Sequence, residues 1–324
     1  MSKSRHLFWS RYDPNLDKTH NDWRNREIKL SPLHLLSLAS HQQYDGVVNL
    51  WTFQEIQTKI PKRIRIKNAG EVFCSKEAFK ALRRGHSLAH ISDAIRLDQA
   101  KEDNGVMLDM DAVLLKELPD KVGWLGSHPA KATGGFAPRW GKSHPPIPVH
   151  DKSWDGKALT AFPVKVSPSM ANEIEKLVKK IKYTLTQPPA QDSKAWNYVM
   201  WTMKKVIYLA KDSHVFPPIG FCPVPAWLPA GKCYSLENPT RLTGKTELFG
   251  YRLPSISEIL SESYVMQHFF ESTFKKCDPL TDTFWTDRVS DKSLLGQEAN
   301  KILGSDWKNI LADTDTVPTI NAKS

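Results

Sequence analysis

The sequence predicts an α/β fold in which a mixed β-sheet is flanked by helices. Short apolar runs alternate with amphipathic helical segments along residues 1–120. The chain has 324 residues, of which 40% are hydrophobic, enough for one large α/β domain or two smaller ones. Two aspartates, Asp109 and Asp111, interrupt an apolar run near the end of an expected strand, where ligands gather in such folds.

The first elements alternate as strand, helix and strand. The dipeptide Ser31-Pro32 predicts a helix start, because serine caps free N–H groups and proline suits the first helical position. Short apolar runs bounded by turn residues such as Asp45-Gly46 predict the strands. The expected elements are a strand at 7–9, a helix over 33–39 and a strand at 47–51.

The next segments continue this alternation. The run Lys62–Lys67 alternates basic residues with isoleucines, which favours a half-exposed strand over a nucleic-acid arm. Leu88, Ile91 and Ile95 have helical spacing, and Asn104-Gly105 ends that helix. The expected elements are a strand at 64–66, a helix from Ser75 to about Gly85, a helix over 88–103 and an apolar strand over 106–115.

The second half of the chain is less regular. Residues 121–163 are rich in glycine, proline and tryptophan, which is typical of a long functional loop. Ser167-Pro168 begins a helix whose apolar stripe is expected in the core, namely Met170, Ile174, Leu177, Val178 and Ile181. The remaining expectations are a helix over 193–208, a proline-rich segment at 215–223 and a polar, weakly helical extension over 276–324.

Composition limits the classes of partner and compartment. Lys and Arg total 45 against 35 Asp and Glu, a formal net charge of +10 that suits anionic partners and also serves solubility. No apolar run approaches the roughly 18 residues of a membrane span, and no signal peptide begins the sequence. The four cysteines form no C-x-x-C pair. We therefore expect a soluble cytoplasmic protein, at most peripheral to a membrane, with reduced thiols.

The pair Asp109 and Asp111 points to a metal site. Burying two carboxylates costs several kcal/mol unless something compensates them, and a divalent cation does so. In an extended strand Met110 points to the opposite face, so both carboxylates share one side. Oxygen ligands favour Mg²⁺ or Mn²⁺ over zinc. The alternative is that both aspartates simply face solvent at a strand end.

A second polar group precedes this pair. Ser92, Asp93 and Arg96 lie within about one helical turn of each other and share the face opposite the apolar stripe. An ordinary ion pair between Asp93 and Arg96 accounts for two of these residues equally well. The combination with the aspartate pair downstream is harder to explain by chance.

These residues resemble the signature of the DXD-containing, metal-dependent glycosyltransferases of the GT-A fold, especially the family 32-like group of initiating α-mannosyltransferases and capsular sugar transferases. The matching motifs are Ser92-Asp93-x-x-Arg96, Asn104-Gly105 and Asp109-x-Asp111. The chain departs at Asn104, where the family prefers glycine, and at Met107, where tyrosine is usual. The resemblance implies one catalytic domain: a nucleotide-sugar half at 1–120, an acceptor half at 121–275 with its loop at 121–163, and an extension at 276–324.

The resemblance extends to further binding residues. It implies that Phe8, Trp9 and Trp51 border the nucleotide base, although aromatic residues here also fit a plain core. Downstream, His268 and Ser272 are similar to a closing H-x-x-x-S-W motif, in which phenylalanine replaces the tryptophan. The histidine would complete the metal shell or touch the diphosphate, and Ser272 would bind the nucleotide. A structural histidine is the alternative.

The resemblance also implies a reaction. A Mn²⁺ or Mg²⁺ ion would bridge the diphosphate to Asp111, with Asp109 binding through ribose or water, and would stabilise the leaving group. Asp93 and Arg96 would hold the hydroxyls of the donor sugar. The donor would be a UDP-sugar in preference to a GDP-sugar, the acceptor a glycan or glycoconjugate, and the anomeric configuration retained.

Two rival functions are open at this point. Asp109-Met-Asp-Ala-Val113 also fits the D-x-D-x-[TV] strand of haloacid-dehalogenase phosphohydrolases, in which the first aspartate attacks phosphate. That motif normally lies on the first strand. A basic nucleic-acid-binding protein would show clustered Lys and Arg among aromatic platforms, whereas here the basic residues are scattered. We therefore expect no nucleic-acid partner.

Overall fold

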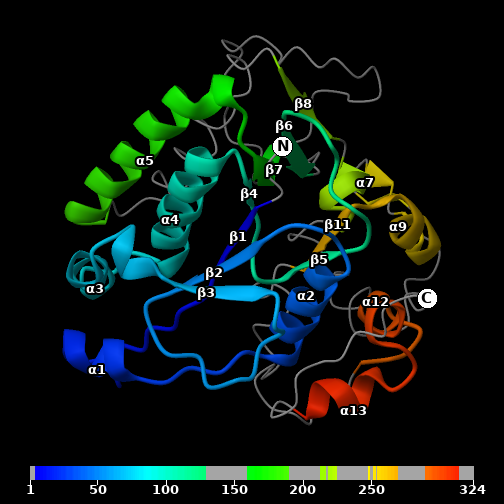
Figure 1. Cartoon of the computed structure of the whole chain (residues 1–324), viewed down its shortest axis with the longest axis horizontal. Coiled ribbons are helices and arrows are strands. Elements are labelled where there is room, and N and C mark those ends of the chain that lie inside the picture. Colours follow the sequence, from blue (N-terminus) through cyan, green and yellow to red (C-terminus); the bar gives the residue numbers. More distant parts are fainter. Residues whose placement is uncertain are drawn as a thin grey trace.

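The computed structural model describes residues 4–128, 159–189, 212–216, 218–224, 247–248, 251–252, 254–268 and 289–313. Within these residues the main sheet has seven strands in the order β3-β2-β1-β4-β7-β6-β8, with helices on both faces (Figure 1). The prediction of an α/β fold with a mixed sheet flanked by helices is confirmed. The predicted helix at 193–208 and Ser272 lie outside the described residues.

The strand order contains a reversal beside β1. Four neighbouring strands run parallel, and the chain goes outward from β1 to β2 and β3 before it crosses back to form β4 on the other side of β1. β7 is antiparallel to β4 and to β6, and β8 is parallel to β6. The strands are β1 (Arg5–Phe8), β2 (Val48–Thr52), β3 (Ile64–Asn68), β4 (Val106–Met107), β6 (Gly123–His128), β7 (Leu159–Lys165) and β8 (Ser213–Val215).

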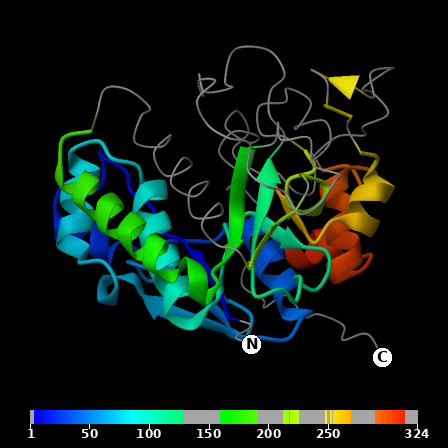
Figure 2. The same cartoon turned by 90° about the horizontal axis from the view of Figure 1, so that it is seen from above.

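Two hydrophobic cores lie on opposite faces of the sheet, as Figure 2 shows for the two groups of helices. One core contains residues of α1 (His20–Asn25), α3 (Ser75–Arg83), α4 (Leu88–Asp103) and α5 (Ala171–Thr186). The other contains residues of α2 (Pro32–Gln42), α7 (Pro218–Phe221), α9 (Ile256–Glu262), α12 (Leu294–Leu303) and α13 (Trp307–Ala312).

Helix starts follow the predicted capping rules. Ser31 is the N-cap of α2, its hydroxyl accepts from the N–H of His34, and Pro32 occupies the first helical position. The apolar stripe predicted from Met170 to Ile181 is buried in the core, as expected. The helix predicted to begin at Ser167-Pro168 starts with a short 3-10 turn, η2 (Pro168–Met170), and continues as α5.

The geometry of the turn between α4 and β4 explains why asparagine and glycine occupy it. Asn104 has a φ of 53°, a left-handed conformation that glycine adopts freely and asparagine better than most residues. A Cβ on Gly105 would clash with Asp103 Oδ1, and it would lie 2.9 Å from the His6 ring and 3.0 Å from the backbone carbonyl of Ser4. Glycine is therefore needed at 105, while asparagine replaces the usual glycine at 104.

The predicted strand over 106–115 is wrong in its middle. The chain leaves β4 after Met107, and the N–H of Ala112 donates to the carbonyl of Asp109 at 3.2 Å, which closes a turn over 109–112. The chain then forms β5 (Ala112–Leu114), which pairs antiparallel with β11 (Val265–Gln267). The apolar run is continuous because both sides of this turn lie in the core, with Met110 buried between the aspartates.

The predicted loop at 121–163 is also wrong at both ends. Residues 123–128 and 159–165 are the antiparallel strands β6 and β7 of the main sheet. Their register shifts between Leu125 and Gly126, a β-bulge that accommodates Pro163 within β7. A strand pair with glycine and proline at its bulge has the same composition as a loop, so composition alone gave the wrong prediction. Residues 129–158 lie outside the described part.

Described residues of the C-terminal segment pack into the core of the fold. Leu294, Leu295 and Trp307 are buried in the same core as α2. A small antiparallel pair, β9 (Glu247–Leu248) with β10 (Tyr251–Arg252), stands apart from the main sheet. The short 3-10 turn η1 (Ala69–Glu71) follows β3. The predicted division at 1–120, 121–275 and 276–324 stays a prediction.

Searching the described ranges alone, we find no helix with the length and apolar character of a membrane span. Of the cysteines in these ranges, Cys74 is a free, exposed thiol and Cys222 is buried.

Candidate active site

The candidate site lies at the strand-order reversal beside β1. The carboxyl ends of β1 and β4 meet there, because these two parallel strands are neighbours whose onward connections lead to opposite sides. Such a reversal opens a crevice for ligands in α/β sheets. Trp9 follows β1 and Asp109 follows β4, so the aromatic run of the first strand and the aspartate pair both reach this edge of the sheet.

The C-terminal half reaches the same place through β11. Its pairing register sets Gln267 opposite Ala112, the residue that follows Asp111. The N–H of His268 then donates to the carbonyl of Asp111 at 3.1 Å. Residues far apart in the sequence therefore hold the turn that carries both aspartates.

Arg96 connects the helix motif to the aspartate motif. Its Nη2 donates to Asp93 Oδ1 at 3.0 Å, and its Nη1 donates to Asp109 Oδ1 at 2.5 Å and to the carbonyl of Leu108. The side chains of Asp93 and Arg96 are only 1% and 4% exposed. This is a buried network and not the surface ion pair that the spacing alone also allowed. Ser92, on the same helix, is buried too.

Burial and the neighbouring charges act in opposite directions on the pKa values of Asp93 and Arg96. Loss of water raises the pKa of Asp93 from 3.8 to about 7, although the positive charge of Arg96 opposes the rise. For Arg96, burial works to lower the pKa, but the carboxylates of Asp109 and Asp93 outweigh it and raise the pKa above its ordinary value. The guanidinium therefore stays charged, while Asp93 exchanges its proton near neutral pH.

Gln267 is a site residue that the sequence did not reveal. Its Nε2 lies 3.1 Å from Asp109 Oδ2 and donates to Asp111 Oδ1 as well. The two carboxylates thus share one side, as predicted, although a turn and not a strand brings them together. No local signal marks Gln267, because only the pairing of β11 with β5 carries it to the aspartates.

The residues present fit a divalent cation held jointly with a ligand. Arg96 donates to Asp93 and Asp109, Gln267 contacts Asp109 and Asp111, and Asp93 Oδ2 is buried without a hydrogen-bond partner in the part of the chain that is described. Among those residues no group of three or more His, Cys, Asp or Glu could hold a metal alone. Mg²⁺ is often bound by one or two carboxylates together with substrate phosphates. Asp109 and Asp111 suit that arrangement.

His268 has a carboxylate partner on α12. Its Nε2 lies 2.6 Å from Glu298 Oε2, and both side chains are fully buried. Burial raises the pKa of Glu298, and the histidine charge opposes that rise. The predicted role of His268 as a metal ligand stays a prediction: its ring contacts Glu298, and its backbone N–H donates to the carbonyl of Asp111.

The three aromatic residues predicted to border a nucleotide base separate in the structure. Phe8 and Trp51 are buried in the core that contains α4, and Trp51 Nε1 donates to His6 Nδ1 at 3.2 Å. Trp9 is half-buried, packs 3.9 Å from the His34 ring between centroids, and donates to the carbonyl of Lys29. Packing therefore accounts for Phe8 and Trp51, and Trp9 is the most accessible of the three. Their contact with a base stays a prediction.

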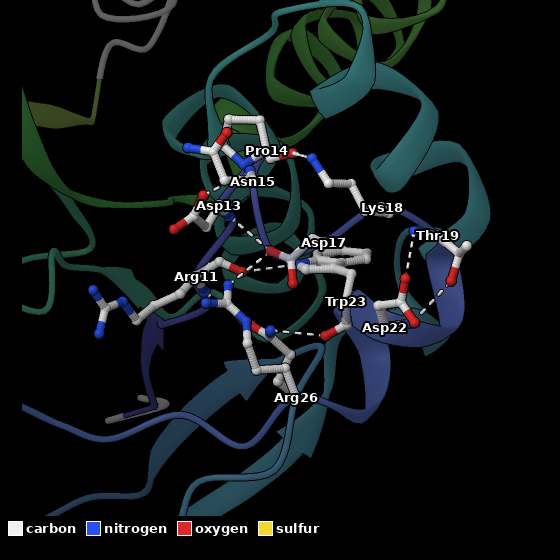
Figure 3. Close-up of polar contacts among 11 residues, drawn as sticks. Arg11, Asp13, Pro14, Asn15, Asp17, Lys18, Thr19, Asp22, Trp23 and Arg26 are labelled. Carbon is white, nitrogen blue, oxygen red and sulfur yellow. Dashed lines mark hydrogen bonds and ion pairs between the residues drawn. The ribbon is translucent and has the colours of Figure 1, made fainter.

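The segment that follows β1 is held by its own polar contacts (Figure 3). The buried Asp17 accepts from the N–H of Asp13 and from Arg26 Nη2, both at 2.7 Å. Trp23 Nε1 donates to the carbonyl of Arg11 at 2.7 Å. These contacts shape the chain as it leaves the edge of the site, and no sequence motif predicts them.

Comparisons with known proteins give little further identification. No family model and no curated protein matches this chain. Among solved structures, it is similar to one described as "PaToxG Glycosyltransferase", with 13% sequence identity and a TM-score of 0.30 over 65% of this chain and 80% of that chain. Similarity at this level does not establish a shared fold or activity.

Proposed function

We propose that the protein is a metal-dependent glycosyltransferase of the GT-A class, which moves a sugar from a nucleoside-diphosphate sugar to a glycan or other hydroxyl acceptor. The observation that carries the proposal is the buried chain from Asp93 through Arg96 to Asp109, joined to Asp111 through Gln267. These motif residues come from a helix and a turn that are separate in sequence, and they meet at the carboxyl edge of β4.

The two aspartates would hold the cation. The side chain of Asp109 is 35% exposed, whereas Asp111 is buried. Bound Mn²⁺ or Mg²⁺ would supply Lewis-acid stabilisation of the departing nucleoside diphosphate. The carboxylates contribute the oxygen ligands and leave room for phosphate oxygens beside them.

The sequence resemblance assigns both Asp93 and Arg96 to the hydroxyls of the donor sugar. We give the two residues different roles. Asp93 has a buried oxygen, Oδ2, available to accept from a sugar hydroxyl. Arg96 has Nη1 and Nη2 on protein oxygens, so we assign it the positioning of Asp109 and Asp93. A UDP donor and retention of the anomeric configuration are carried over from the sequence resemblance, as is a glycan acceptor.

The test is release of free nucleotide from a panel of UDP- and GDP-sugars, with Mn²⁺, Mg²⁺ or EDTA and without acceptor. We expect metal-dependent release from one donor, and its loss in Asp111→Asn. Asp98→Asn, on the outer part of α4 and paired with Lys182, is the matched control and should release nucleotide like the native protein.

Two other results would contradict the proposal. Hydrolysis of simple phosphate esters without any turnover of nucleotide sugars would favour the phosphohydrolase, with Asp109 as nucleophile. Tight, salt-dependent binding of nucleic acid without either activity would favour the non-enzymatic alternative.

A further inference from the structure

Gln267 occupies the space between the two aspartates. It ends β11, is 3% exposed, and contacts one oxygen of each carboxylate through the same nitrogen. The Nε2 group of glutamine carries two protons, so each carboxylate receives one. The amide thereby separates two negative charges without adding a charge of its own.

The orientation of this amide follows from the carboxylates. With the amide reversed, Oε1 would face two negatively charged oxygens, and both would lose the N–H that Gln267 donates to them. A cation between the aspartates inverts this preference, because N–H groups would then point at a positive charge. An amide oxygen is by contrast a ligand that Mg²⁺ and Mn²⁺ accept.

The exchange between these two orientations needs only a local rotation. The last torsion of a glutamine side chain is broad and roughly two-fold, so a half-turn replaces Nε2 by Oε1 at nearly the same place. The backbone of β11 stays paired with β5 throughout, since Gln267 is held there by its register with Ala112.

We infer that Gln267 is a two-state partner of the aspartate pair. Its amide nitrogen holds Asp109 and Asp111 together when no cation is present, and its Oε1 joins them as a ligand when a divalent cation binds. This inference rests on the proposed function in that it takes a divalent cation as the ligand of the site.

The test measures Mn²⁺ affinity directly, from the electron paramagnetic resonance signal of free Mn²⁺, for each variant both without nucleotide and with UDP or GDP present. Gln267→Met keeps the length of the side chain and removes both its donor and its ligand oxygen. We expect Mn²⁺ to bind about tenfold or more weakly to this variant. Gln267→Glu supplies an oxygen at the same position and should restore at least native affinity.

A matched control separates loss of a ligand from loss of any buried amide. Gln54 is equally buried and uses its amide on Arg11 and Trp23, away from the aspartates. Gln54→Met should bind Mn²⁺ like the native protein. Unfolding in guanidinium with EDTA checks that each variant is folded, and Gln267→Asn replaces Gln267→Met if the latter does not fold.

Each further outcome decides one question. If the native protein binds Mn²⁺ and Gln267→Met binds it equally or more tightly, the inference about Gln267 is overturned and the proposed function stands. A Gln267→Glu affinity below that of Gln267→Met overturns the inference as well. If the native protein binds no Mn²⁺ even with UDP or GDP present, the proposed function fails.

Discussion

Replacement of Arg96 by methionine removes the cation that joins the buried carboxylates. Arg96 is 4% exposed and donates to Asp93, Asp109 and a carbonyl, while methionine fills similar space without any donor. Removing one partner of a buried ion pair typically costs about 3–5 kcal/mol, because the other charge is left uncompensated. We expect a loss of that size in the free energy of unfolding at about pH 8.5.

The same variant should have a distinctive pH dependence. The pKa of Asp93 is about 7 in the folded protein and 3.8 in its ordinary state, so folding takes up a proton between these values. The contribution of Asp93 to native stability therefore falls as the pH rises from about 4 to about 7, and it changes little above that. Without the positive charge of Arg96 the pKa of Asp93 rises further, so the variant continues to lose stability above pH 7.

The assay is guanidinium unfolding of native protein and Arg96→Met at several pH values. The difference in unfolding free energy should be clearly smaller near pH 5 than near pH 8.5, because the contacts of Arg96 to Asp109 and the Leu108 carbonyl are lost at both pH values, and Asp93→Asn added to the variant should flatten it. Lys80→Met, which breaks an exposed pair with Glu77, is the control and should cost under about 1 kcal/mol at every pH. A loss in Arg96→Met that is the same at both pH values would refute the reasoning.

Three further predictions concern stability, each measured by chemical unfolding. Trp307→Ala should cost about 3–5 kcal/mol, because this side chain is buried in the core with α2; a loss under 1 kcal/mol would show that 289–313 is dispensable. Glu298→Ala should cost about 1–3 kcal/mol by leaving the His268 ring without its carboxylate, and Glu298→Gln should cost less; equal losses would argue against this hydrogen bond. Asp17→Ala should cost a similar amount by unpairing Arg26, and unchanged stability would contradict the burial of that pair.

Local signals predicted the elements that depend on neighbouring residues. Ser31-Pro32 and the apolar stripe from Met170 to Ile181 each contain, within a few residues, the groups that satisfy a helix start or a core face. The Asn104-Gly105 turn was predicted for the same reason, since its strain is local. The polar face of α4 was also predicted, although its burial was not.

Long-range pairing explains what the sequence did not reveal. Gln267 and Asp111 are 156 positions apart, and His268 and Glu298 are 30 apart, so only the register of β11 and the docking of α12 bring them together. The turn at 109–112 was missed because its apolar residues are buried on both sides, as in a strand. The sequence could not show which of Trp9 and Trp51 is buried, because the two residues are equally hydrophobic and only tertiary packing decides which ring is covered.

The most direct test of the central claim is calorimetric titration of UDP and GDP in Mn²⁺ and in EDTA, on the native protein and Asp111→Asn. We predict that one nucleotide binds the native protein in Mn²⁺, that EDTA abolishes this binding, and that Asp111→Asn does not bind it under either condition. Nucleotide binding that persists in EDTA and in Asp111→Asn would contradict a metal-bridged diphosphate at the aspartate pair, as would the absence of binding to the native protein.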